Sequence, residues 1–465
     1  MLQRAATQPV LVHFRGVGGA GMRALATVMD GADVNISGSD GSPAMCEELA
    51  GYGWSISPAS QPVDLSEVDL VVCSDAIPAD DPVRLAAARQ GLAVQSYADA
   101  VGRQLTGQTR VAIAGTHGKS TTTAMAAEIL TNARLDPTVI CGAVPRGGWS
   151  STGGRRGRND LVVVEACEYR DNFLKLPANV AAITNIEPDH FDFFETSSQL
   201  AGSFRRFAEC IDRTGVLVAG HECSAVMDAA RTARCRIETF GLRAKSDWSA
   251  GVRQWRDGYA ELQLRFRRRN LGKVKLQVPG RHNAMNAVAA AAIAMHCGAR
   301  PSDVTEGLAG FVGLRRRMQR LGEFQGLHIW DDYAHHPTEI RSTLDTLRKI
   351  HSTSRIICIF QPHQVSRTTA LFADFVESLQ LADLVLIAPI FRARERHNRA
   401  GEITRAGEIT ARDLASCISR CGTPSFACRD FHSIRSVLKL VCCTGDVLAT
   451  LGAGDIWKIS HAFAD

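Results

Sequence analysis

The sequence predicts an α/β protein of three domains, and three observations lead to that prediction. The chain has 465 residues, more than one hydrophobic core usually spans, which favours about three domains of ordinary size. Short apolar runs alternate with helical stretches, as in parallel sheets covered by helices. Two glycine-rich loops, one near the start of the chain and one at residues 115–118, each follow an apolar run and open a helical stretch.

Composition and charge restrict the class of protein. Hydrophobic residues make up 45% and charged residues 22%, which is ordinary for a globular chain. The net charge of +5 is too small to indicate nucleic acid and suits small anionic substrates. No apolar stretch is long enough to span a membrane, and the 14 cysteines lack the spacing of a metal site. Since the N-terminus also lacks a secretion signal, we expect reduced thiols and a cytoplasmic location.

The first domain is expected over residues 1–107. Apolar runs at 10–14, 34–36 and 70–73 predict strands, and the pattern at 22–29 predicts a helix. The polar stretch that follows residue 106 interrupts the pattern, and we place the domain boundary there.

The second and third domains are expected over residues 108–320 and 321–465. The second begins with a strand at 110–114 and a helix at 120–132. Alternation at period two over 259–278 predicts an antiparallel pair with one solvated face. Further signals predict a helix at 284–297 and strands at 161–164, 180–184, 327–330, 356–360, 384–388 and 447–451.

The first glycine loop runs from Gly16 to Gly21, and Asp40 follows near the end of the second strand. This spacing matches the pyrophosphate-binding fingerprint of Rossmann-like folds, in which glycines let the backbone approach the phosphates at a helix N-terminus. A tight turn alone would also need glycine, so a purely structural role is the alternative.

The second loop contains the Gly-Lys-Ser core of a phosphate loop, although Ile113 stands where the full motif has an earlier glycine. Its backbone N–H groups would face phosphate oxygens, Lys119 would contact the outer phosphates, and the Ser120 or Thr121 hydroxyl would bind Mg²⁺. ATP and Mg²⁺ are therefore the expected cofactors, with a chance match as the alternative. The complete loop is Gly115, Thr116, His117, Gly118, Lys119, Ser120 and Thr121.

Acidic and imidazole side chains follow the next two strands. Glu165 ends the strand at 161–164 and is our choice for a Mg²⁺ ligand, ahead of Glu168. His190 follows the next strand beside other polar residues, and we expect its neutral imidazole to bind a second metal ion. The alternatives are an exposed carboxylate at a strand end and a structural histidine.

Further polar residues lie downstream. Asn283 and Asn286 share one face at the start of a helix, where amides can contact adenine; capping by Asn283 is the alternative. His336 follows a strand of the third domain, directly after two acids, a tyrosine, an alanine and another histidine. Arg367 follows another strand, and a guanidinium at such a position indicates a carboxylate-bearing substrate.

The order of these motifs resembles one known family, the Mur ligases of peptidoglycan synthesis, and the resemblance covers the whole chain. The matching segments are HFRGVGGAGM at 13–22, SGSD at 37–40, GTHGKSTTT at 115–123, VVEACEY at 163–169, NIEPDHFD at 185–192, PGRHNAMNAVAA at 279–290, RRRM at 315–318, DDYAHHPTEI at 331–340, FQPHQVSRT at 360–368 and LGAGDI at 451–456.

The resemblance implies an ATP-dependent ligase that joins L-alanine to the lactyl carboxylate of UDP-N-acetylmuramate through an acyl phosphate. It also implies a Rossmann-like first domain that binds UDP, a central P-loop domain with a mixed sheet, and a Rossmann-like third domain. The implied roles are UDP binding for Gly18, Gly19, Gly21, Ser39 and Asp40; ATP binding for the phosphate loop, Asn283, Asn286 and Arg317; metal binding for Ser120, Glu165 and His190; and L-alanine positioning for His336 and Arg367. Lys119, Glu165, His190, His336 and Arg367 form the implied catalytic group.

Some positions depart from the family pattern. Arg15 replaces an apolar residue before the first loop. Gln364 and Val365 replace an arginine and a tyrosine, and because an arginine near the amino-acid pocket is lost, we expect serine or glycine to compete with L-alanine. Between Lys175 and Lys245 the chain offers no lysine of the kind that related ligases carbamylate.

Three alternatives to this function remain: a ligase that recycles a preformed peptide, a nicotinamide dehydrogenase that uses the first loop, and a non-catalytic nucleotide-binding regulator. The expected assembly is a monomer or homodimer.

Overall fold

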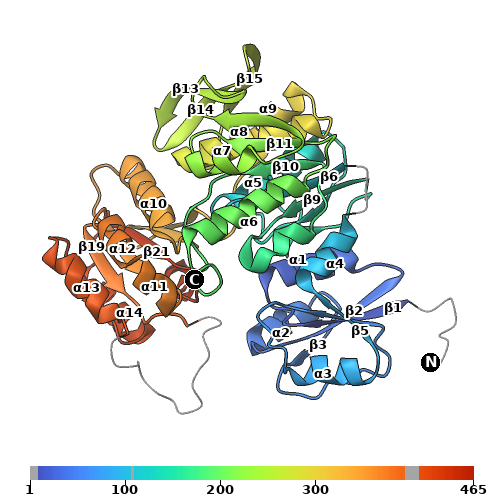
Figure 1. Cartoon of the computed structure of the whole chain (residues 1–465). Coiled ribbons are helices and arrows are strands. Elements are labelled where there is room, and N and C mark those ends of the chain that lie inside the picture. Colours follow the sequence, from blue (N-terminus) through green and yellow to red (C-terminus); the bar gives the residue numbers. More distant parts are fainter. Residues whose placement is uncertain (1–8, 106–108, 159, 393–407, 465) are drawn as a thin grey trace.

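The computed structural model of the chain describes residues 9–105, 109–158, 160–392 and 408–464. Three sheets follow one another along the chain, and helices cover each of them (Figure 1). We call the resulting parts the N-terminal, central and C-terminal bodies; they are blue, green and orange in Figure 1. The predicted α/β fold class, with a mixed sheet between two Rossmann-like units, is confirmed.

The N-terminal body has a five-stranded parallel sheet of order β3-β2-β1-β4-β5. Strands β2 and β3 are added on one side of β1, and β4 and β5 on the other. The strand order therefore changes direction at β1, and the first glycine loop follows that strand at its carboxyl end. The predicted second strand is longer than expected, because β2 continues to Asp40. The elements are β1 Val10–Arg15, α1 Ala20–Met29, β2 Val34–Asp40, α2 Pro43–Ala50, β3 Ser55–Pro58, β4 Leu70–Cys73, α3 Pro82–Arg89, β5 Ala93–Ser96 and α4 Tyr97–Gln104.

The central body has a ten-stranded mixed sheet of order β15-β14-β13-β12-β11-β10-β6-β9-β7-β8. Parallel strands form its middle, and the antiparallel pair predicted over 259–278 is confirmed as β14 and β15. The elements are β6 Thr109–Ala114, α5 Lys119–Asn132, β7 Thr138–Ile140, β8 Gly154–Arg155, β9 Leu161–Glu165, η1 Tyr169–Lys175, β10 Val180–Ile183, α6 Ser197–Cys210, β11 Val216–Gly220, α7 Ser224–Ala230, β12 Arg236–Gly241, β13 Trp248–Arg256, β14 Tyr259–Phe266, β15 Arg269–Lys275, α8 Arg281–His296 and α9 Pro301–Gly310.

The C-terminal body has a six-stranded sheet of order β16-β17-β21-β18-β19-β20, parallel except for the edge strand β16. The elements are β16 Gln319–Phe324, β17 Leu327–Asp332, α10 Pro337–Ile350, β18 Ile356–Phe360, α11 Val365–Ala370, α12 Phe372–Leu379, β19 Leu384–Ile387, α13 Ala411–Arg420, β20 Ser425–Ala427, α14 Phe431–Val441, β21 Val447–Leu451 and α15 Trp457–Ala464.

The core of the central body explains why the phosphate loop is held rigidly. Strands β6 and β10 are almost wholly buried, and the alanine-rich helix α8 packs with α5 on one face of the sheet. Helix α9 also packs closely on α5, and a glycine allows it: a Cβ on Gly307 of α9 would lie 2.6 Å from the Ile129 Cα of α5. The strand and the helix that flank the loop are therefore fixed by packing on both sides.

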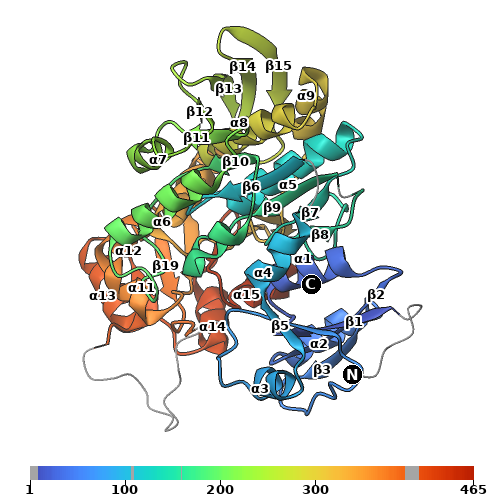
Figure 2. The same cartoon turned by 45° about the vertical axis from the view of Figure 1, so that its right-hand side comes forward.

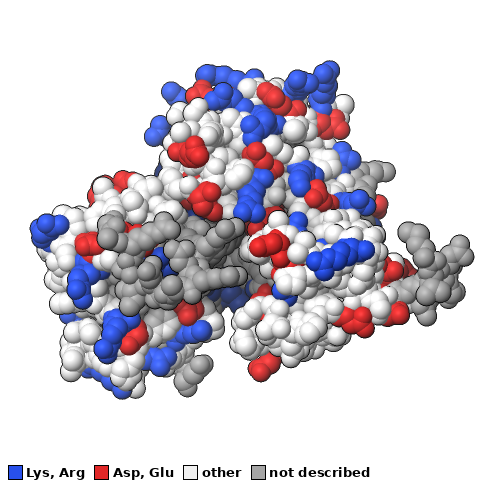
Figure 3. Space-filling model, turned by 60° about the horizontal axis from the view of Figure 1, so that its bottom comes forward, with Lys and Arg blue, Asp and Glu red and all other residues white. Residues whose placement is uncertain are grey.

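Thiols, helix lengths and surface charge were all considered in the sequence analysis, and the structure describes each of them. All 14 cysteines are free. Within the described ranges no helix is long and apolar enough to cross a membrane. On the coloured part of the face in Figure 3, basic and acidic side chains are interspersed rather than gathered into one basic surface.

Candidate active site

A cavity of about 870 Å³ is lined by residues from all three bodies. It receives the first glycine loop from the N-terminal body, the phosphate loop from the central body, and loops that follow β17 and β18 from the C-terminal body. Figure 2 shows the C-terminal body on one side of the central body and the N-terminal body below the central body. The expected site residues that line the cavity are Gly18, Gly19, Thr116, His117, Gly118, Lys119, Ser120, Thr121, Glu165, His190, Asn283, Asn286, Arg317 and Arg367.

Five expected site residues do not line this cavity: Gly21, Ser39, Asp40, Gly115 and His336. Two of them support the first glycine loop from behind. Asp40 accepts hydrogen bonds from the backbone N–H groups of Gly18 (2.8 Å) and Ser42 (3.0 Å). Ser39 is fully buried, and its hydroxyl contacts His13 and Arg15, both at 3.1 Å.

Gly21 is required for packing at the base of the first loop. A Cβ at this position would lie 2.7 Å from the hydroxyl oxygen of Tyr97 in α4. Helix α1 can therefore approach α4 only with glycine here, so a packing role explains this residue without any ligand contact.

The phosphate loop is shaped by left-handed glycines and by the neighbouring strand β10. Gly118 has φ +80° and caps α5, and a Cβ there would lie 2.5 Å from Asn286 Oδ1. Asn185, which follows β10, accepts a hydrogen bond from the His117 N–H at 2.8 Å. The loop thus presents the N-terminus of α5 to the cavity, a geometry that favours anions.

Lys119 lies inside the loop and contacts protein groups. Its amine donates to the Thr116 carbonyl at 3.0 Å, to the Gly115 carbonyl, and forms an ion pair with Glu168 at 3.0 Å. Burial acts to lower the pKa of Lys119, but the Glu168 carboxylate outweighs it and holds that pKa above its usual value. The side chain is therefore a fixed positive charge beside the cavity.

The expected metal ligands form two adjacent groups. Ser120 donates its hydroxyl to Glu165 Oε1 at 3.0 Å, which brings together two oxygen ligands of the kind that Mg²⁺ prefers. His190 instead faces Glu168, with Nε2 at 3.5 Å from the carboxylate, and Cys167 completes a group that could hold a metal ion. Ser120 and Glu165 therefore fit a magnesium ion, while His190 lies with Glu168.

Glu168 is more central than the sequence suggested. It is 1% exposed and touches both Lys119 and His190. Burial acts to raise its pKa, but Lys119 and His190 lower it, so the carboxylate stays charged. The sequence shows Glu168 as a second acid three residues after Glu165. Glu165 was preferred because it lies directly at the end of the strand.

Asn283 and Asn286 lie at the start of α8 beside the phosphate loop. Asn283 does not cap the helix, because Gly280 occupies the N-cap position and the Asn283 amide donates to the Pro279 carbonyl at 2.7 Å. Asn286 donates to Asn283 Oδ1 at 3.3 Å. The capping alternative for Asn283 was therefore wrong, and both amides border the cavity.

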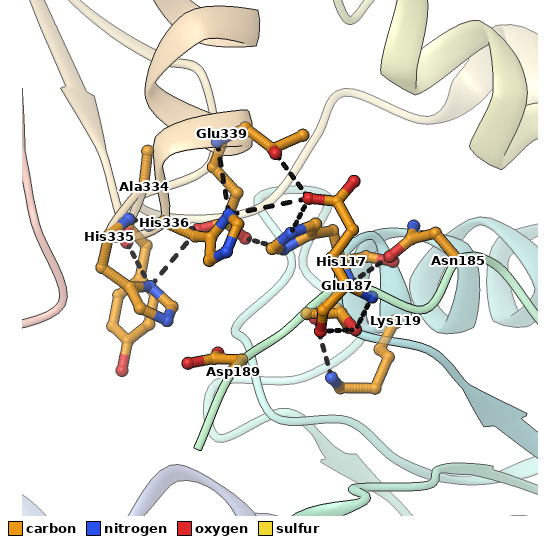
Figure 4. Close-up of polar contacts among 12 residues, drawn as sticks. His117, Lys119, Asn185, Glu187, Asp189, Ala334, His335, His336 and Glu339 are labelled. Atoms are coloured by element: carbon orange, nitrogen blue, oxygen red, sulfur yellow. Dashed lines mark hydrogen bonds and ion pairs between the residues drawn. The ribbon is translucent and has the colours of Figure 1, made fainter. Parts of the chain in front are cut away.

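The C-terminal body closes onto the phosphate loop through polar side chains (Figure 4). Glu339 of α10 accepts a hydrogen bond from His117 Nδ1 at 3.1 Å and lies 3.7 Å from Arg317. Burial acts to lower the pKa of His117, but the carboxylates of Glu339 and Glu187 outweigh it and raise that pKa to about 9. A charged imidazole thus links the loop to the C-terminal body at neutral pH.

His336 and Arg367 both make hydrogen bonds to the central body in this arrangement. His336 caps α10, with its Nδ1 accepting from the Thr338 N–H at 3.2 Å and its Nε2 donating to the Pro188 carbonyl at 3.2 Å. Arg367 is 3% exposed and donates to Asp189 Oδ1 at 2.7 Å. Sequence patterns could not predict this ion pair, because the partners lie 178 positions apart.

Comparison with known protein families covers nearly the whole chain. The family model of the Mur ligase middle domain matches residues 113–294. The model of the Mur ligase glutamate ligase domain matches residues 316–454, and that of the Mur ligase family catalytic domain matches residues 11–109. The fold and a phosphate loop at a three-body cavity define an ATP-using enzyme, and these matches show that the chain belongs to the Mur ligase family.

Individual relatives agree with this assignment. The chain is 33% identical to UDP-N-acetylmuramate–L-alanine ligase of Clostridium acetobutylicum, over 97% of each chain. It is 36% identical to the enzyme of the same name from Caldicellulosiruptor bescii, over 96% of each chain. Its fold is similar to the crystal structure of UDP-N-acetylmuramate–alanine ligase from Thermotoga maritima, with a TM-score of 0.79, 25% identity and 97% of each chain covered.

Proposed function

We propose that this enzyme joins L-alanine to the lactyl carboxylate of UDP-N-acetylmuramate with consumption of ATP, in peptidoglycan precursor synthesis. A carboxylate oxygen attacks the γ-phosphorus, ADP leaves, and an acyl phosphate forms. The alanine amine nitrogen then attacks the acyl carbon, phosphate leaves, and the nitrogen loses a proton, which gives the amide. The observation that carries the proposal is the phosphate loop with Lys119 at a cavity shared by three bodies, in a chain whose relatives bear this activity in their names.

Each body supplies one part of the site in this proposal. Gly18 and Gly19 face the UDP-sugar, and Asp40 holds their loop through the Gly18 N–H. The N–H groups of the phosphate loop and the Lys119 charge bind the ATP phosphates, and Asn283 and Asn286 lie where adenine would reach α8. Arg317 adds a second cation beside the phosphates, and Arg367 faces the incoming amino acid.

Mg²⁺ completes the proposed site. Ser120 and Glu165 offer oxygen ligands next to the phosphate loop, and His190 with Glu168 lies beside them. Such an ion supplies charge stabilisation to the transferring phosphoryl group. Crowded negative charge from ATP and a carboxylate substrate makes cations necessary, and Lys119 and Arg317 contribute to the same balance.

The domain limits of 1–107, 108–320 and 321–465 stand as part of this proposal, as do a cytoplasmic location and a monomeric or homodimeric state. The N-terminal and central sheets fall within these limits, whereas the edge strand β16 of the C-terminal sheet begins at Gln319, just before the third limit. Small-molecule substrates rather than nucleic acid are part of the same proposal, and the modest net charge of +5 supports them.

An amino-acid panel tests the substrate assignment. The enzyme is incubated with Mg-ATP and UDP-N-acetylmuramate together with L-alanine, L-serine, glycine or a preformed tripeptide, and the products are identified by mass spectrometry. We expect L-alanine to give the amide fastest. Amide formed only from the tripeptide would support the recycling ligase instead.

A further inference from the structure

A second cluster of metal-binding side chains lies beside the phosphate loop and belongs to two bodies (Figure 4). It consists of His117 and Glu187 of the central body and His336 of the C-terminal body, whose ligand atoms all lie within 4.8 Å of one another. His117 Nε2 and His336 Nδ1 lie 3.5 Å and 3.8 Å from the same Glu187 oxygen. Tetrahedral zinc ligands are about 3.4 Å apart, so the spacing needs little adjustment.

The outer ring atoms of both histidines are already held as in metal sites. His117 Nδ1 contacts the Glu339 carboxylate at 3.1 Å, and His336 Nε2 contacts the Pro188 carbonyl at 3.2 Å. Metal-binding histidines almost always donate their second ring N–H to a carboxylate or carbonyl, which fixes the ring orientation. In both residues the remaining nitrogen faces Glu187.

The inward-facing atoms have little else to bind. His117 Nε2 is buried and has no hydrogen-bond partner. His336 Nδ1 accepts one bond, from the Thr338 N–H at 3.2 Å, and this is the contact that a metal ion would replace. The Glu187 oxygen that faces both histidines also accepts a bond from the Thr338 hydroxyl, and a carboxylate oxygen has lone pairs for both a hydroxyl and a cation.

We propose that His117, Glu187 and His336 bind a zinc ion at a site separate from the magnesium site, and that the ion ties the central body to the C-terminal body. Two neutral imidazoles and one carboxylate are a ligand set that zinc accepts, and His117 releases the proton that it carries at neutral pH to solvent when the metal binds. Magnesium instead prefers oxygen ligands such as Ser120 and Glu165. Because His117 and Glu187 line the cavity, a fourth ligand position is open to it.

The expected consequence is inhibition. The ligase needs its bodies to separate for product release, and a metal ion that bridges them would slow that step. This consequence rests on the proposed function, whereas metal binding itself does not. Binding is therefore measured first and without substrates, so that failure of the site and failure of the function are distinguishable.

Calorimetric titration with zinc chloride, in the presence of excess magnesium chloride, tests the site on the full chain. We expect Glu187→Gln to weaken the tightest binding event at least tenfold, because the carboxamide is a poor zinc ligand. Glu306→Gln, which makes the same charge change on an exposed residue of α9, should leave it unchanged. Equal affinity in wild type and Glu187→Gln would overturn the proposal.

Two further variants locate the ion. His336→Asn keeps a side-chain acceptor for the α10 cap and should also weaken binding, so the test holds even where Glu187→Gln fails to fold. Loss of the tightest binding in Cys167→Ala, with Glu187→Gln unaffected, would place the ion in the group of Cys167, Glu168 and His190 and so contradict the assignment. Cobalt(II) in place of zinc should give a tetrahedral absorption spectrum that His336→Asn reduces.

Zinc inhibition of phosphate release is the last experiment, and it tests whether the ion slows the enzyme through this site. In excess magnesium, zinc should inhibit wild type and Glu306→Gln at concentrations that leave Glu187→Gln active. Equal sensitivity of all three enzymes would show that zinc does not act through this site.

Discussion

Arg15 departs from the family pattern, and the structure gives it a buried partner. Its guanidinium donates to Asp81 at 2.9 Å, to the Ser39 hydroxyl at 3.1 Å and to the Ala59 carbonyl at 3.2 Å. Asp81 also caps α3. The arginine therefore ties three segments together beneath the first glycine loop, where an apolar residue would only pack. Removal of either charged partner would leave the other buried and unpaired, which is costly.

His13 beside this pair predicts a measurable acid sensitivity. Burial, with the charge of Arg15, lowers the pKa of His13 from 6.5 to about 4. The folded state therefore resists protonation that the unfolded chain accepts, and this contribution to stability is present above pH 6.5 and is lost as the pH falls toward 4. The loss amounts to about 2 kcal/mol by pH 5.

Thermal unfolding at pH 7.5 and pH 5 measures this effect. His13→Gln, which keeps a polar side chain for Ser37 and Ser39, should lose less stability between the two pH values than wild type. The same loss in both proteins would show that His13 does not titrate as described.

Lys119→Ala should reduce the ligation rate more than tenfold, because one positioned charge on a transferring phosphoryl group contributes roughly 3 kcal/mol. The amine also bonds the Gly115 and Thr116 carbonyls, so circular dichroism and the melting temperature must be recorded alongside. A folded variant that retains more than a tenth of the wild-type rate would refute the assignment of Lys119.

At the scale of elements, sequence periodicity found the buried strands and missed the exposed ones. β4 and β18 match their predicted ranges, because they are continuous apolar runs buried on both faces. β3 and β5 are four-residue strands at the sheet edges, and β13 carries exposed polar residues along half its length. Such strands are defined by neighbours that a local pattern does not contain.

The same limit applies to the site. Residues within a motif, such as the phosphate loop, were predicted because the chemistry depends on local spacing. The contacts of Lys119 with Glu168 and of Arg367 with Asp189 were not, because they depend on how distant elements meet. Ser39 and Asp40 were expected to contact substrate, but their positions behind the loop depend on β2 continuing past its apolar part.

The contact of α1 with β8 joins the N-terminal and central bodies, and it depends on one glycine. A Cβ on Gly154 would lie 2.1 Å from the Ala24 carbonyl oxygen. Gly154→Ala should therefore force the two elements apart and destabilise the protein by roughly 1–3 kcal/mol. Chemical denaturation measures the change.

Gly202→Ala is the matched control for that substitution. Gly202 lies in α6 with open space around its Cβ position, so the added methyl should be neutral or stabilise the helix by roughly 0.5–1 kcal/mol. Equal stability of Gly154→Ala and wild type would show that α1 and β8 can move apart to accept the methyl group at little cost in stability.

At the scale of the whole molecule, three bodies converge on one cavity and are linked across it by polar contacts. Asn172 donates to Asp75 at 2.6 Å between the central and N-terminal bodies. Arg367 and Asp189 pair at 2.7 Å, and His117 contacts Glu339, between the central and C-terminal bodies. These contacts close the cavity around the reacting groups, which protects an acyl phosphate from water.

The measurement that tests the central claim most directly is phosphate release by the purified protein with Mg-ATP, UDP-N-acetylmuramate and L-alanine, with each component omitted in turn. Rapid release only when all three are present is the predicted result, since the amine must capture an acyl phosphate formed from the other two. Absence of release with the complete mixture, from folded protein that binds ATP, would contradict the assigned reaction.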